Sequence, residues 1–256
     1  MTQLTWARKE IQLMKLTRRG CLSAVSASLI SGTSFRLDAF QDQGNRPPGT
    51  HEDKTDGKTW IKRLERPDRI PGLKTDQVIQ CLKLKPGMVV ADIGAGTGAY
   101  SIPFAKAVAP SGVSLSVDIW PELLEYVAGK AKKQGVTNLK PVLAKLDDPN
   151  LPRNQVDLAY FHDVFHNTND RQAYLRTLVS ELKPTGRIAI VEQEYDDPIA
   201  KKWDHDADRI RKEQVDNWMA NVGFRLVDQF DIFEGRNNPS GTGMPARWFV
   251  VYGKKA

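Results

Sequence analysis

Short apolar runs alternate with longer amphipathic segments along most of this chain, and this alternation constrains the fold more than any other feature. The apolar runs predict strands, and the segments between them, with apolar residues at helical spacing, predict helices. Regular alternation of this kind is typical of a parallel sheet with helices on both faces. Strands are expected at residues 88–93, 113–117, 139–143, 156–161 and 187–191, and helices at 76–84, 97–108, 121–134 and 172–182.

The C-terminal part of the chain departs from the alternation. A helix is expected at 208–222, and two strands follow at 224–233 and 248–252 with no helix between them. Strands joined in this way are antiparallel to each other. The sequence therefore predicts an α/β fold, a doubly wound, mostly parallel seven-stranded sheet that ends in an antiparallel pair.

Composition and charge limit the classes of partner. The chain has 256 residues, of which 40% are hydrophobic, enough for one domain with a sizeable core. Its formal charge of +6 arises mostly in residues 1–40, so the remainder is nearly neutral. Because a nucleic-acid footprint needs a basic patch on the folded body, we expect no nucleic-acid partner. The two cysteines, Cys21 and Cys81, exclude a disulfide framework and a cysteine zinc site within one chain.

An export signal is predicted near the N-terminus. Residues 14–35 read MKLTRRGCLSAVSASLISGTSF, a positive region followed by an uncharged stretch. The Arg18-Arg19 pair resembles a twin-arginine signal, so we expect a periplasmic protein. An inert leader on a cytoplasmic protein, a leader retained as an anchor and a start at Met14 stay as alternatives. The stretch is too short and polar to predict a stable membrane span. We divide the chain into this leader (1–40), a linker (41–58) and a folded domain (59–256).

A glycine-rich loop directly follows the first predicted strand. Gly94, Gly96 and Gly98 let the chain turn sharply and let a ligand approach bare backbone at a helix N-terminus. The run also fits the dinucleotide fingerprint, and Asp118, at the end of the next strand, is suited to hold a ribose in either case. Asp92, two residues before the first glycine, and the antiparallel strand pair argue against a nicotinamide cofactor.

Residues 89–98, VVADIGAGTG, resemble the first motif of the class I S-adenosylmethionine-dependent methyltransferases, and the resemblance extends from about residue 60 to 252. It implies a Rossmann-like methyltransferase fold and S-adenosylmethionine as the cofactor. It also implies that Gly94, Gly96 and Gly98 lie against the methionine part of the cofactor, with Asp92 near its amino group.

The same resemblance assigns residues to the nucleoside part of the cofactor. Asp118 would accept both ribose hydroxyls, and Ile119 would pack on the adenine. Asp147, which we favour over Asp148, would meet the adenine amino group. The alternative for the last two is that they simply initiate the turn at Pro149.

Candidate catalytic residues follow the fourth predicted strand, at the edge where open α/β folds bind ligands. We expect His166 and Asp163 to be catalytic, with His166 as a general base, and His162 to wall the cofactor. Glu192 and Glu194 are alternative bases. No ligand cluster with recognised metal spacing accompanies them, so no metal is expected.

The sequence thus predicts an enzyme that transfers a methyl group to a small-molecule acceptor by direct in-line displacement. A non-catalytic S-adenosylmethionine-binding module is the first alternative, and a nicotinamide-dependent oxidoreductase is the second. Trp203 and His205 are candidate lid residues, and Trp60 and Arg63 belong either to the opposite wall of the pocket or to a packed N-terminal segment.

Overall fold

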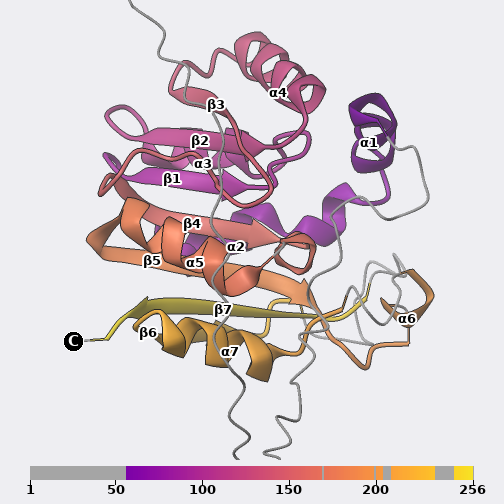
Figure 1. Cartoon of the computed structure of the whole chain (residues 1–256). Helices are drawn as coiled ribbons and strands as arrows, with labels where there is room; N and C mark the ends of the chain where they lie inside the picture. The colour runs from indigo at the N-terminus through magenta and orange to yellow at the C-terminus, as the bar shows by residue number, and fades with distance from the viewer. Residues whose placement is uncertain (1–55, 169, 199, 204–208, 234–244, 256) are drawn as a thin grey trace, which may run out of the picture. The chain divides into compact units, whose positions relative to one another are not determined.

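A seven-stranded sheet forms the centre of the folded domain (Figure 1). The computed structural model describes residues 56–168, 170–198, 200–203, 209–233 and 245–255. The strand order is β3-β2-β1-β4-β5-β7-β6. The first five strands pair in parallel, and β7 runs antiparallel to both β5 and β6, so the predicted fold class is confirmed. The strands are β1 (Val89–Ile93), β2 (Val113–Asp118), β3 (Leu139–Leu143), β4 (Val156–His162), β5 (Leu182–Gln193), β6 (Phe224–Phe230) and β7 (Arg247–Lys254).

Helices bury an apolar core on each face of this sheet. On one face α2 and α3 pack against alternate residues of β1 and β4, including Leu158 and Tyr160. On the other face α5 and α7 pack against a second cluster that contains Phe161. The helices are α1 (Gly57–Leu64), α2 (Thr75–Leu82), α3 (Ser101–Val108), α4 (Pro121–Lys133), α5 (Arg171–Glu181), α6 (Ala200–Trp203) and α7 (Lys212–Asn221), with 3-10 turns η1 (Ile70–Leu73) and η2 (Phe165–Asn167).

Among the boundaries that differ from prediction, two have identifiable reasons, and one helix was not predicted. The helix expected from residue 97 begins at Ser101, because Gly98 has a φ of +75° that an α-helix does not accommodate. The strand expected from residue 187 begins at Leu182, and a register shift opposite β4 lets Pro184 and Gly186 lie inside it. The segment before residue 76 holds a helix, α1, whose first turn is capped by Asp56.

The carboxyl ends of the parallel strands place the predicted site residues at one edge of the sheet. The glycine loop follows β1, Asp118 ends β2, and His162 ends β4. Since β7 is antiparallel, its first residue, Arg247, pairs with Gln193 at this same edge. None of the helices described is long and apolar enough to cross a membrane. The predicted leader, most of the linker and His205 lie outside the described residues.

Candidate active site

The glycine loop is a tight turn that surrounding side chains hold in place. Gly94, Gly96 and Gly98 have φ values of +67°, +54° and +75°, a region that favours glycine. A Cβ at Gly94 would lie 2.3 Å from Val164 Cγ2, and one at Gly96 would lie 2.7 Å from Leu64 Cδ1. Packing as well as backbone conformation therefore requires glycine at these positions.

Asp118 connects the end of β2 to this loop. Its Oδ2 accepts a hydrogen bond from the Gly96 amide at 2.9 Å, and its Oδ1 accepts one from the Trp120 amide at 3.1 Å. Burial raises the pKa of this carboxyl group, and these backbone donors act in the opposite direction. A carboxylate has about four acceptor positions, so this one retains capacity for a pair of ribose hydroxyls.

The neighbouring residues also suit the nucleoside part of S-adenosylmethionine. Ile119 leaves 40% of its surface exposed beside Asp118, which gives a planar base an apolar surface. Asp147 is exposed, whereas Asp148 Oδ1 accepts the Asn150 amide at 2.7 Å and so forms the turn. The turn expected for Asp148 is therefore present, and the choice of Asp147 for the adenine amino group stays a prediction. The donor set and the exposed apolar surface fit the cofactor, while each contact with it stays a prediction.

Asp92 is buried inside β1 beneath α3. Ser101 Oγ donates a hydrogen bond to its Oδ2 at 2.5 Å, and the same hydroxyl lies 3.0 Å from Ser116 Oγ. The pKa of Asp92 is raised to about 7, mainly by burial and to a smaller extent by the nearby Asp118 carboxylate, while the hydrogen bond from Ser101 acts in the opposite direction. Asp92 therefore has a structural partner, and its contact with the cofactor amino group stays a prediction.

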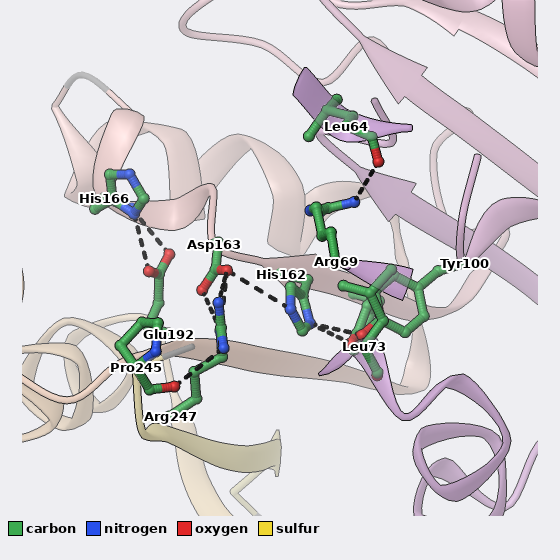
Figure 2. Close-up of polar contacts among 11 residues, drawn as sticks. Leu64, Arg69, Leu73, Tyr100, His162, Asp163, His166, Glu192, Pro245 and Arg247 are labelled. Carbon is green, nitrogen blue, oxygen red and sulfur yellow. Dashed lines mark hydrogen bonds and ion pairs between the residues drawn. The ribbon is translucent and has the colours of Figure 1, made fainter. Parts of the chain in front are cut away.

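His166 and Glu192 form a buried pair at the end of β5 (Figure 2). His166 Nδ1 lies 2.8 Å from Glu192 Oε2, and the His166 amide donates to Oε1 at 3.2 Å. Arg171 donates to the His166 carbonyl at 2.6 Å, which fixes the turn η2. A carboxylate on Nδ1 orients the ring and favours a proton on that nitrogen. Glu192, expected as an alternative base or a solvated loop charge, is buried and paired with His166, and its role in catalysis stays a prediction.

Asp163 lies between the two histidines and is held by Arg247. Arg247 donates through Nε and Nη2 to the carboxylate at 2.7–2.9 Å. Burial alone would raise the pKa of Asp163, but Arg247 holds it well below its usual range. The carboxylate therefore stays ionised and is a weak base, so its catalytic role, which stays a prediction, is better suited to orientation than to proton transfer.

The sequence analysis missed two arginines at this site. Arg247 directly precedes the apolar C-terminal strand in the sequence. Because an antiparallel strand starts at the edge where the parallel strands end, this position could have placed Arg247 at the site. Arg69, between α1 and η1, had no such signal; its Nη1 donates to the Leu64 carbonyl at 3.3 Å. Across the described ranges, no group of three or more His, Cys, Asp or Glu side chains is arranged to hold a metal ion.

Comparisons with known proteins agree with the fold and the glycine loop. Residues 84–231 match the family model described as a methyltransferase domain. A ubiquinone/menaquinone biosynthesis C-methyltransferase of Vibrio vulnificus is 29% identical over 129 residues, 49% of this chain and 50% of that protein. The chain thus spans about half the length of the curated relatives it matches.

Solved structures share the architecture. A SAM-dependent methyltransferase from Aquifex aeolicus superposes with a TM-score of 0.67 over 79% of this chain and all of that one, at 23% identity. The [4+2]-cyclase SpnF superposes with a TM-score of 0.59 over 72% of this chain and 81% of that one, at 16% identity. These similarities show the fold and no more, since one fold serves several chemistries. The match of the family model to more than half of the chain shows that it belongs to the class I S-adenosylmethionine-dependent methyltransferases.

Proposed function

We propose that this protein transfers the methyl group of S-adenosylmethionine to a small aromatic acceptor that carries an ionisable hydroxyl group. The observation that carries the proposal is the His166–Glu192 pair, which lies at the same edge of the sheet as the glycine loop and Asp118. A histidine whose Nδ1 is held by a buried carboxylate is suited to take a proton from a hydroxyl group.

The proposed role of each residue follows from its position. Bound S-adenosylmethionine supplies an electrophilic methyl group on a sulfonium, so alignment matters more than covalent machinery. Asp118 and the glycine loop hold the cofactor, and His166 Nε2 accepts the acceptor's hydroxyl proton. Glu192 stabilises the imidazolium that forms. The methyl–sulfur bond breaks with its electron pair left on sulfur, and a new bond forms to the nucleophile.

The accepting atom is proposed to be the ring carbon next to the hydroxyl. Loss of the hydroxyl proton places negative charge on that carbon as well as on oxygen. After carbon methylation, the ring hydrogen at that carbon leaves as a proton and aromaticity returns. The printed names of relatives such as the Vibrio vulnificus protein, biosynthetic C-methyltransferases, support carbon over oxygen.

The test is methyl transfer by the full chain with S-adenosylmethionine and hydroquinone, measured as S-adenosylhomocysteine formed and as the mass of the product. His166→Ala is expected to lower kcat by about 10²–10⁴-fold, because it removes the base. Glu192→Gln is expected to lower kcat less, because the base remains but loses its counter-charge.

Calorimetric titration with S-adenosylhomocysteine supplies the control. Asp118→Ala is expected to weaken this binding by about 100-fold, since two hydrogen bonds to a charged group are lost. His166→Ala is expected to leave it unchanged. Tight S-adenosylhomocysteine binding without transfer to any hydroxylated aromatic compound would refute the proposed reaction and favour the non-catalytic binding module.

A further inference from the structure

His162, at the end of β4, has one ring nitrogen that is fully paired and one that is not. Its side chain is 4% exposed and packs against the rings of Tyr100 and Phe233. Nδ1 lies 3.0 Å from Tyr100 Oη and 2.9 Å from Tyr160 Oη. Nε2 is buried and has no hydrogen-bond partner within the described part of the chain. Such an orphan nitrogen in a native core calls for an explanation.

The tyrosine contacts assign the tautomer of this histidine. Tyr100 donates its only hydroxyl proton to the Leu73 carbonyl at 2.6 Å. Tyr160 donates its own hydroxyl proton to Tyr100. Neither tyrosine therefore has a proton left for Nδ1, and the proton in both contacts comes from Nδ1. Burial lowers the pKa of His162 to about 3, so the ring is neutral and carries one proton. That proton is on Nδ1, and Nε2 presents a lone pair.

A second acceptor lies beside this lone pair. Asp163 Oδ2 is 3.7 Å from Nε2, and both atoms are acceptors that face the same edge of the sheet (Figure 2). Asp163 Oδ2 already accepts hydrogen bonds from Arg247 Nε and Nη2, whereas Nε2 has no donor. An acceptor without a donor is unfavourable when buried, because it loses its hydrogen bond to water. A ligand that brings an N–H or O–H group would remove this cost.

The surrounding charges select the kind of donor. Arg247 is paired with Asp163, and Arg69 also interacts with this carboxylate, so two guanidinium groups surround one carboxylate. At His162, burial opposes a positive charge most strongly, Asp163 favours one, and the same two arginines oppose it. An ammonium donor would meet this excess of positive charge, whereas a neutral hydroxyl would not. His166 lies on the other side of Asp163, so a hydroxyl at His162 is a second one (Figure 2).

We propose that His162 Nε2, beside the Arg247-bound Asp163, accepts a hydrogen bond from a second, neutral hydroxyl of the methyl acceptor. The inference rests on the proposed function, since it assigns a group of that same acceptor. His162 is then a substrate-binding residue that selects dihydroxy compounds, and not only a wall of the cofactor pocket.

The tautomer is tested by 15N NMR of the full chain labelled at histidine. The chain has four histidines, and His162→Phe identifies the His162 signals by their loss. The expected spectrum has a protonated Nδ1 and an unprotonated Nε2. Tyr100→Phe removes the acceptor that fixes Nδ1–H, so it should release the other tautomer. A wild-type spectrum with Nε2 protonated overturns the proposal.

Hydroquinone is the probe for the ligand. Saturating hydroquinone is expected to shift the Nε2 signal towards that of a hydrogen-bonded nitrogen, and 1,4-dimethoxybenzene, which has no donor, is not. A shift with S-adenosylhomocysteine alone would mean that the cofactor ammonium is the donor, and an unmoved signal at saturation would mean that no donor reaches Nε2. Either result overturns the proposal.

Binding of the two probes by the His162→Phe variant distinguishes a hydrogen-bonding role of His162 from a packing role. His162→Phe keeps a ring at this position but removes the lone pair, so it should weaken hydroquinone binding about 3- to 10-fold and leave 1,4-dimethoxybenzene unchanged. Equal effects on both probes would assign His162 a structural role. Failure of methyl transfer with an Nε2 signal that responds to hydroquinone would refute the reaction and leave this binding role intact.

Discussion

At the scale of single residues, Asp92 is a buried carboxyl group that the fold makes much harder to ionise than an exposed one. Burial raises its pKa to about 7 from an ordinary value of 3.8. Between these values the folded chain holds a proton that the unfolded chain releases, so stability falls as pH rises from about 4 through 7. Asp92→Asn is neutral at every pH. We expect it to exceed the wild type in stability by roughly 2–4 kcal/mol at pH 8 and to match it below pH 4.

Urea unfolding at several pH values between 4 and 8 measures this difference. Asp147→Asn is the matched control, since the same substitution there lies on an exposed turn. A difference between Asp92→Asn and the wild type that stays constant with pH would show that Asp92 is ionised throughout.

Single residues also differ in how far the sequence predicts them. Gly94 and Asp118 were placed correctly, because a strand end followed by a turn fixes their position in the sheet. The pairing of His166 with Glu192 was not, since it joins the turn η2 to β5 across 26 residues through the Glu192 side chain. Tyr100, 62 residues before His162, was missed for the same reason.

At the scale of elements, local patterns predicted strands well and irregular segments poorly. The bounds of β3 were predicted without error, because turns and polar residues enclose its apolar run. The first residues of β5 were missed, since Pro184 and Gly186 are usually excluded from strands and only the bulge opposite β4 admits them. The short helix α1 has no apolar stripe long enough to predict. It packs against α4, and the residue after it, Glu65, forms an ion pair with Lys130.

The glycine loop offers an element-scale prediction with a matched control. Gly94 and Gly135 both have a φ of +67°, but a Cβ at Gly94 would lie 2.3 Å from Val164, whereas one at Gly135 would meet nothing within 4 Å. Gly135→Ala should cost about 1 kcal/mol from backbone conformation alone. Gly94→Ala should cost roughly 1–3 kcal/mol more because of the overlap. Urea unfolding of both variants measures the two costs.

A third variant identifies the source of the extra cost. Combining Gly94→Ala with Val164→Ala removes the overlapping methyl groups, so part of the added cost should be recovered relative to Val164→Ala alone. Equal stability of Gly94→Ala and Gly135→Ala would contradict the packing argument.

At the scale of the whole molecule, the net charge is distributed unevenly between the predicted leader and the folded domain. Most of the formal charge of +6 lies within residues 1–40, and the domain that binds the cofactor is nearly neutral. A twin-arginine signal is compatible with membership of a family that uses S-adenosylmethionine. The twin-arginine route carries folded proteins, so a cofactor-loaded domain can cross the membrane. We propose that the leader directs export and that the Arg18-Arg19 pair is the part of it on which export depends.

Replacement of this pair tests the location of the protein. Expressed at full length in a bacterium with the twin-arginine pathway, the wild type is expected in the periplasmic fraction. Changing Arg18→Lys and Arg19→Lys together keeps the charge but removes the signal, so the protein should stay in the cytoplasm. The control changes Arg8→Lys and Arg36→Lys, which lie outside the pair and should leave export intact. Periplasmic protein from the Arg18/Arg19 variant, or cytoplasmic protein from the wild type, would show that the leader is inert.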